Sequence, residues 1–298
     1  MEDTVVTLTE LNELETRLFG DNRRTTGLRE RNRQTLVRVE QFRREIAESA
    51  ISKGDYLNIA REHPYFGILP CFAAQAEFVM MYANDDVVAR EYLWFGKDAY
   101  EPEIIKRWWD WCQTPGLVLD IGGYSGLMSI LAASASVGND VHLFEPMEAI
   151  CERARLNVKL NGFGKRITVH NIAASNKNGE ETINLFRPSN GPLHGTGSSL
   201  YKKGMENKEI VETKKIIAQV LDDYLPDAEP SVVKIDVEGH ELPVLQGMQK
   251  TLRRSKPRLI IEVWQHTRHE VLSFLESMGY HLEQVETKTK PVNNFFAV

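Results

Sequence analysis

Short apolar runs alternate with longer segments of helical periodicity through the second half of the chain. Runs rich in Val, Ile, Leu and Phe predict strands at 117–121, 141–145, 167–173, 231–236 and 258–264. Between several of them, apolar residues recur every three or four positions, which is typical of helices that pack on a sheet. Two more strand-like runs follow, HLEQVE and NNFFAV. This order predicts an α/β fold with a doubly wound, mostly parallel, seven-stranded Rossmann-like sheet and an antiparallel C-terminal edge strand.

The first 60 residues are charged and helix-prone, and we interpret residues 1–60 as a helical N-terminal extension. Thr7 and Glu10 have the spacing of a capping box. A longer helix is predicted from about Leu28 to Ile51. Its apolar stripe consists of Leu28, Leu36, Val39, Phe42, Ile46 and Ala50. Such a stripe must be buried, either on the parent domain or in a homodimer, and the sequence leaves both alternatives open.

Residues 61–298 are expected to form one domain, in which 61–112 lead into the sheet and cap it. Trp108, Trp109 and Trp111 lie in this lead-in, next to isoleucines at helical spacing. Tryptophans can stack on a ligand, but this spacing favours packing in the core.

Residues 174–230 are longer than a crossover between two strands requires, and we interpret them as an insertion over the site. They contain strand-like runs, TINLFRPS and EIVETKKIIAQVL, on either side of the flexible GPLHGTGSSL segment. A glycine-rich loop of this kind is typical of a substrate lid, and the alternative is an added edge hairpin.

Composition excludes several function classes. The chain is 42% hydrophobic and 26% charged, and its net charge of -6 argues against a general nucleic-acid binder. No apolar run approaches the roughly 20 residues that span a bilayer. The acidic start MEDTVVTLTE is not a secretory signal, and three widely spaced cysteines suit a reducing compartment. We therefore expect a cytoplasmic protein that binds neither nucleic acid nor membrane.

The first predicted strand ends in a glycine turn with the pattern D-x-G-x-x-x-G, formed by Asp120, Gly122 and Gly126. The nicotinamide fingerprint G-x-G-x-x-G fails, because Tyr124 stands where the second glycine belongs. A carboxylate at Asp120 would repel a pyrophosphate and attract the cationic amino-acid end of S-adenosylmethionine. The turn therefore favours S-adenosylmethionine as the cofactor.

Two further strand ends complete the predicted nucleoside site. Glu145 follows the second strand, about 20 residues past the turn, where an acidic side chain accepts hydrogen bonds from both ribose hydroxyls. Asn171 and Ala173 end the third strand and are placed to meet the adenine edge. Together, the three strand ends predict a cofactor-binding edge of the sheet.

These residues resemble the FkbM family of methyltransferases. The matching segments are VLDIGGYSG (118–126), HLFEP (142–146), LNVKLNG (156–162), GSSL (197–200) and KIDVEGHELPVLQGM (234–248). The resemblance covers about residues 90–298 and implies a class I methyltransferase domain that transfers a methyl group from S-adenosylmethionine to a hydroxyl of a small molecule or sugar. The cofactor contacts that it implies are Asp120, Gly122, Tyr124, Ser125, Gly126 and Glu145. Relatives often have Gly-Ala-Asn at this turn, so we expect Tyr124 to cover the cofactor rather than hydrogen-bond it.

Ionisable residues follow the fourth strand, at the edge where the acceptor would bind, and we predict a catalytic role for Asp236, Glu238 and His240. His240 is the predicted general base, because imidazole titrates near neutral pH; the alternative is a solvent-exposed helix residue. His194 and His266 are the next candidates. Asp236 and Glu238 would orient the base or bind acceptor hydroxyls. With Glu262 they have the oxygen ligands of Mg²⁺, but no diagnostic spacing, so a divalent metal is not favoured.

Two other functions stay open. N-methyltransferases that act on nucleobase amines commonly carry an Asn/Asp-Pro-Pro-Tyr run after the fourth strand, where this chain reads IDVE at 235–238. A non-catalytic nucleoside-binding module that recruits a partner through the N-terminal helices is the second alternative. The acidic residues after the fourth strand argue against it, because a scaffold has no use for them.

Overall fold

The computed structural model describes residues 23–48, 56–186, 210–285 and 291–298. Three of the sequence-based expectations lie outside the described residues. They are the capping box of Thr7 and Glu10, the position of Ala50 on the apolar stripe, and the GPLHGTGSSL segment with His194.

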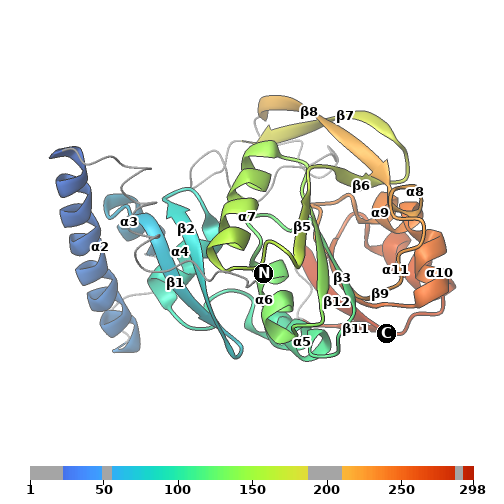
Figure 1. Cartoon of the computed structure of the whole chain (residues 1–298), viewed down its shortest axis with the longest axis horizontal. Helices are drawn as coiled ribbons and strands as arrows, with labels where there is room; N and C mark the ends of the chain where they lie inside the picture. Colours follow the sequence, from blue (N-terminus) through green and yellow to red (C-terminus); the bar gives the residue numbers. More distant parts are fainter. Residues whose placement is uncertain (1–22, 49–55, 187–209, 286–290) are drawn as a thin grey trace.

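A seven-stranded sheet forms the centre of the molecule, in the order β11-β12-β10-β9-β3-β4-β5 (Figure 1). Its strands are β3 (Leu117–Ile121), β4 (Asp140–Phe144), β5 (Ile167–His170), β9 (Pro230–Ile235), β10 (Arg258–Trp264), β11 (Leu282–Gln284) and β12 (Val292–Ala297). Five of them pair in parallel, and β12 is antiparallel to both β10 and β11. The doubly wound sheet is therefore confirmed.

The antiparallel strand is not at the edge of the sheet, which differs from the sequence-based expectation. The short strand β11 lies outside it, and β12 is almost completely buried, including Phe295 and Phe296. A strand with apolar residues on both faces needs neighbours on both sides, whereas a short, half-exposed strand suits an edge.

Helices cover both faces of the sheet. They are α5 (Pro102–Cys112), α6 (Leu127–Ala135), α7 (Glu148–Leu160), α8 (Leu221–Tyr224), α9 (Glu241–Gly247), α10 (Gln249–Ser255) and α11 (Arg268–Ser277). One core contains residues of α5, α6 and α7 with Val118 and Val232, and the other contains residues of α9, α10 and α11 with Leu119 and Val233. Successive strand residues thus face opposite cores. None of the described helices is long and apolar enough to cross a bilayer.

The lead-in contains a hairpin, β1 (Phe66–Ala73) and β2 (Ala76–Ala83), whose strands the sequence pattern did not reveal. Asn157 of α7 and Asn161, the C-cap of this helix, attach β2 to the domain. The Asn161 side chain accepts the Val79 N–H at 2.9 Å and donates to the Val79 carbonyl at 2.8 Å. The Asn157 side chain accepts the Met81 N–H at 2.7 Å. The side chains thus occupy positions that a neighbouring strand would fill.

The three tryptophans of α5 are core residues, as their spacing predicts. Trp108 is completely buried, and its indole N–H donates to the Met128 carbonyl of α6 at 2.8 Å. Trp109 and Trp111 are each only 8% exposed. Helix α5 therefore packs tightly against α6, the helix that follows the glycine turn.

The long N-terminal helix is α2 (Arg23–Ala47), which starts and ends earlier than predicted. Three residues of its stripe, Val39, Phe42 and Ile46, belong to the same core as helix α4 (Val87–Phe95) of the same chain, whereas Leu36 is 43% exposed (Figure 1). Phe42 is completely buried and meets Trp94 edge to face, with ring centroids 5.3 Å apart. The Arg43 guanidinium donates to three carbonyls at the C-terminal end of α4. These contacts favour packing on the parent domain over a dimer contact.

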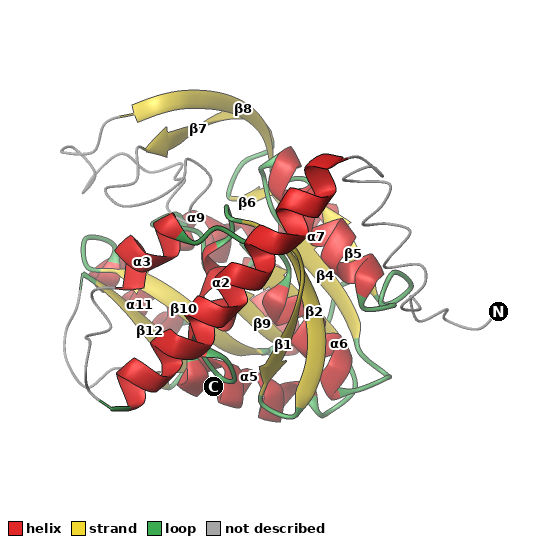
Figure 2. Ribbon diagram, turned by 90° about the vertical axis from the view of Figure 1, so that its left-hand side faces the viewer, coloured by secondary structure: helices red, strands yellow, loops and turns green. Residues whose placement is uncertain are grey.

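A second sheet, in the order β6-β8-β7, lies beside the central one. It contains β6 (Ala173–Ser175), β7 (Gly179–Phe186) and β8 (Ile210–Val220). The paired strands β7 and β8 extend past the body of the domain (Figure 2). The described parts of both strand-like runs of the insertion are therefore strands. The third predicted strand is divided between two sheets after His170.

Replacing Phe42 with alanine should reduce the free energy of unfolding by about 3–5 kcal/mol, because a buried aromatic leaves a cavity that its neighbours cannot fill. Thermal unfolding measures the loss. Leu36→Ala is the matched control on the same helix, since Leu36 is 43% exposed and should change stability by less than about 0.5 kcal/mol. Light scattering should show the same mass for both variants. A smaller mass for Phe42→Ala would indicate a contact between copies instead.

Candidate active site

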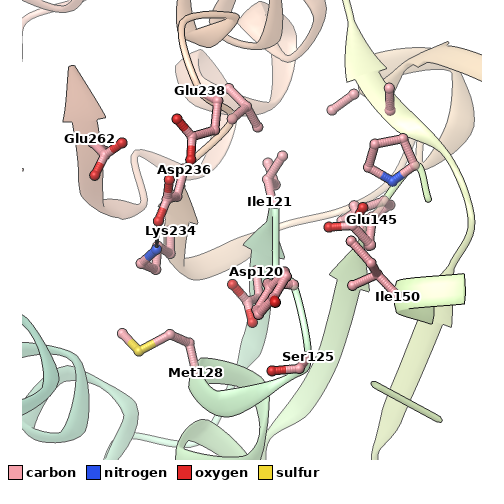
Figure 3. Close-up of a pocket in the computed structure, with 18 of the residues that line it drawn as sticks. Asp120, Ile121, Ser125, Met128, Glu145, Ile150, Lys234, Asp236, Glu238 and Glu262 are labelled. Carbon is pink, nitrogen blue, oxygen red and sulfur yellow. Dashed lines mark hydrogen bonds and ion pairs between the residues drawn. The ribbon is translucent and has the colours of Figure 1, made fainter. Parts of the chain in front are cut away.

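A cavity of about 210 Å³ opens at the carboxyl ends of the parallel strands. Its wall is built from the glycine turn after β3, the ends of β4, β9 and β10, and residues of β6 and β7 (Figure 3). The wall also includes Val88 of α4, Tyr100 just before α5, Met128 of α6 and Ile150 of α7. Ligands of open α/β sheets bind at this edge.

The glycine turn and the end of β9 touch each other. Gly122 has a φ of +81°, and a Cβ on it would lie 1.8 Å from the Asp236 carbonyl oxygen. The Asp236 N–H donates to the Ile121 carbonyl at 2.9 Å, and the Gly122 N–H donates to the Phe144 carbonyl at 2.9 Å. Only glycine fits there, because both the backbone conformation and the space exclude a side chain.

Asp120 lies beneath this turn and is completely buried. Its Oδ2 accepts the Ser129 hydroxyl at 2.7 Å, while its Oδ1 has no hydrogen-bond partner among the described residues. Burial raises the pKa of this carboxyl, and the neighbouring Lys234 ammonium opposes that shift. An unpaired buried carboxylate oxygen is costly without a ligand.

Glu145, just after β4, is 7% exposed and lines the cavity. Its carboxylate accepts the Met147 N–H at 2.9 Å and the Tyr124 backbone N–H. Burial raises the pKa of Glu145 to about 7, although these backbone donors favour the charged form. Tyr124 has a φ of +47° and lines the same cavity. The turn after β3 thus also orients the carboxylate after β4.

Of the four remaining residues predicted to bind the cofactor, two line the cavity and two do not. Ser125 and Ala173 line the cavity, whereas Gly126 and Asn171 do not. Gly126 has a φ of +95° and is the N-cap of α6, so its role lies in the conformation of the turn. The Asn171 amide donates to the carbonyls of Glu145 and Pro146 at 3.1 and 2.9 Å. It therefore fixes the loop that carries Glu145, and its neighbour Ile172 lines the cavity instead.

Charged residues gather on the opposite side of the cavity, where Lys234, Asp236, Glu238 and Glu262 lie around one space (Figure 3). The Lys234 Nζ is 2.6 Å from Asp236 Oδ2. Burial and the negative charges of Asp236 and Glu238 raise the pKa of Glu262 far above its ordinary value. The described residues form no group of three or more side chains that could hold a metal ion.

Sequence reasoning missed Lys234, Tyr100 and Val88. A lysine inside the otherwise apolar strand PSVVKI was the available signal for the first, because an isolated buried cation requires partners. The other two are far away in the sequence, and no motif marks them.

His240 lines the cavity just before α9, and its Nε2 is 3.0 Å from the Ser175 hydroxyl of β6. Burial lowers the pKa of this imidazole to about 4. This pKa lies below the near-neutral value expected from the sequence, and the side chain is half-buried instead of solvent-exposed. At neutral pH the ring is uncharged and able to accept a proton. His266 is not part of the cavity wall.

A family model described as the methyltransferase FkbM domain matches residues 120–282, which is more than half of the chain. Methyltransferase sdnD of Sordaria araneosa is 24% identical to this chain over 200 residues, which cover 58% of this chain and 77% of that protein.

Among solved structures, the chain is similar to methyltransferase FkbM from Methylobacillus flagellatus, with 17% identity and a TM-score of 0.44. That match covers 62% of this chain and 44% of the other, so the chain spans less than half the length of this relative. It is also similar to Aeropyrum pernix fibrillarin in complex with S-adenosyl-L-methionine, with 11% identity, a TM-score of 0.40, and coverage of 63% and 68% of the two chains.

Replacing Gly122 with alanine should reduce the free energy of unfolding by about 3 kcal/mol or more, because the new methyl group meets the backbone of Asp236. The damage would come from this clash within the protein, and not from filling ligand space. Denaturant titration measures the loss. Gly164→Ala is the control, since no atom lies within 4 Å of a Cβ there. Equal stability of the two variants would contradict the close approach.

Proposed function

Because the chain belongs to the FkbM family of methyltransferases, we propose that it transfers the methyl group of S-adenosylmethionine to a hydroxyl group of a small molecule or sugar. The observation that carries the proposal is the placement of Asp120, Glu145 and Asp236 around one cavity, each at the end of a different parallel strand. When bound, the cofactor supplies a methyl group on a positively charged sulfur.

The Glu145 side of the cavity suits the cofactor. The carboxylate is held by two backbone N–H groups and has acceptor capacity left for ribose hydroxyls. The unpaired Oδ1 of Asp120 suits a cationic group. Ile172 and Ala173 offer an apolar surface to a nucleobase.

The Asp236 side of the cavity suits the methyl acceptor. Carboxylates there accept hydrogen bonds from hydroxyl groups and orient them. Asp236 and Glu238 would hold the acceptor, and His240, neutral at physiological pH, would take up its proton. We propose no metal in this step.

The remaining expectations stay predictions. We expect a cytoplasmic protein, and its three cysteines are free and buried in the structure. We also expect no binding to nucleic acid or membrane. A homodimer through the N-terminal helices would use side chains of α2 that face outward, such as Val37, which is 53% exposed.

Replacing Glu145 with glutamine should weaken the binding of S-adenosylhomocysteine about tenfold or more, because charge-assisted hydrogen bonds contribute about 1.5–3 kcal/mol each. Since burial raises the pKa of Glu145 to about 7, affinity in the native protein should grow as pH rises from 6 to 8. The variant should lose this dependence. Isothermal titration measures both effects, with Glu148→Gln on the exposed surface as the control. Unchanged affinity in Glu145→Gln would contradict the ribose assignment.

Replacing His240 with alanine should reduce turnover about 100- to 10,000-fold and leave the affinity for S-adenosylhomocysteine nearly unchanged, because its role is proton removal. The acidic limb of the native pH–rate profile should lie near pH 4, and the variant should lose it. Asp236→Asn should mainly raise the KM of the acceptor. The exposed His269→Ala is the control. Near-native turnover of His240→Ala would show that another group is the base.

A methyl-release assay on matched acceptors tests the reaction class. A sugar and its amino-sugar analogue distinguish transfer to oxygen from transfer to nitrogen. Binding of the cofactor without turnover on a broad panel of hydroxyl and amine acceptors would favour the non-catalytic module.

A further inference from the structure

Lys234 is a buried cation in the wall of the cavity, and nothing in the proposed reaction uses it. The residue is 5% exposed, and its Nζ lies 2.6 Å from Asp236 Oδ2. On the neighbouring strand β3, Asp120 is its register partner. Lys234 therefore lies between a carboxylate assigned to the cofactor side and one assigned to the acceptor side.

The surroundings of Lys234 are strongly acidic. The titratable groups that face this part of the cavity come from β3, the end of β9, β10 and the segment before α5. They are Asp120, Asp236, Glu238, Glu262, Tyr100 and Glu101. Burial alone would lower the pKa of Lys234, but the charges of Asp236, Glu101 and Asp120 outweigh burial and raise it. The lysine thus stays charged throughout the neutral pH range.

We propose that Lys234 is a positioning residue that holds the carboxylate of Asp236 and compensates the charge of Asp120 on the neighbouring strand, and so makes the preference of the cavity for the cationic cofactor over its neutral product independent of pH. The inference rests on the proposed function, because it assigns the cavity to S-adenosylmethionine.

The physical reason is the net charge of Lys234, Asp120 and Asp236 taken together. With Lys234 in place, the lysine and the two aspartates together carry one net negative charge, which attracts a sulfonium ion. Without the lysine, two buried carboxylates would lie close together with no cation between them. Each would then take up a proton more readily, so the charge facing the sulfonium would change between pH 6 and 8.

The difference between two ligands reports this charge. S-adenosylmethionine carries the sulfonium and S-adenosylhomocysteine does not, while both share the ribose and adenine. Hydrogen bonds to Glu145 are therefore common to both and cancel in the ratio of their dissociation constants. Isothermal titration of both ligands at pH 6, 7 and 8 measures this ratio without any methyl acceptor.

Because Glu145 itself titrates near pH 7, every protein in this comparison carries Glu145→Gln, which removes that change of charge. With Lys234 present, the ratio should then change by less than about threefold over this range. In Lys234→Met, the preference for S-adenosylmethionine should rise about tenfold from pH 6 to pH 8, because the carboxylates lose their protons over that range. Lys234→Arg keeps the charge and should behave like the protein with Lys234. Lys234→Gln is a second neutral variant, which can still donate a hydrogen bond to Asp236 if Lys234→Met does not fold.

Val232→Ala is the matched structural control, because Val232 precedes Lys234 on the same face of β9, in the core and away from the cavity. It should lower the melting temperature and leave the ratio as in Glu145→Gln alone. In the Glu145→Gln background, a flat ratio in the neutral variants, the same rise in Val232→Ala, or a tenfold change with Lys234 present would each overturn the inference. If the native protein binds neither ligand, the proposed function itself fails.

Discussion

The contact on which the site depends is the approach of the glycine turn to the end of β9. Parallel neighbours β3 and β9 end at the same level, and the Gly122 backbone lies against the Asp236 carbonyl with no room for a side chain. This contact joins two segments more than 100 residues apart in the sequence. Because of it, the residues that follow β3 and those that follow β9 share one cavity. Separating these strand ends would divide the cofactor side from the acceptor side.

The strand pleat then decides which side chains meet. Asp120, Lys234 and Glu262 alternate with the apolar residues of their strands and lie toward the α5 and α6 side of the sheet, as their apolar neighbours Val118, Val232 and Ile260 do. Each apolar row ends in a charged residue. Desolvation of a charged side chain costs little free energy at the open edge of the sheet and much more deeper inside. The fold therefore collects opposite charges in a single layer at the carboxyl ends of the strands, where Lys234 compensates part of the negative charge.

Much of this arrangement could be predicted from the sequence, because it depends on local patterns. The strands β3, β9 and β10 are short apolar runs with clear ends, and the glycine turn is a spacing motif. The hairpin β1–β2 was missed: Pro70 argues against a strand, and it is tolerated because a two-stranded sheet leaves one side of β1 unpaired. The pKa of His240 could not be read from the sequence, since burial beside Ser175 of the second sheet causes the shift.

The part of the chain before the sheet contributes directly to the site. Helix α7 ties the hairpin to the domain through Asn157, whose side chain joins the Met81 N–H of β2 to the Ser125 carbonyl of the glycine turn. The hairpin is followed by α4, so this anchor helps to position Val88 in the cavity wall. Tyr100 precedes α5, and the packing of α5 on α6 helps to position it in the same wall. The family match begins at residue 120, so these wall residues lie outside it. Residues that surround a shared cofactor site but lie outside the family match are the natural candidates for determining acceptor choice. We therefore expect the identity of the methyl acceptor to depend on this lead-in as much as on the carboxylates after β9.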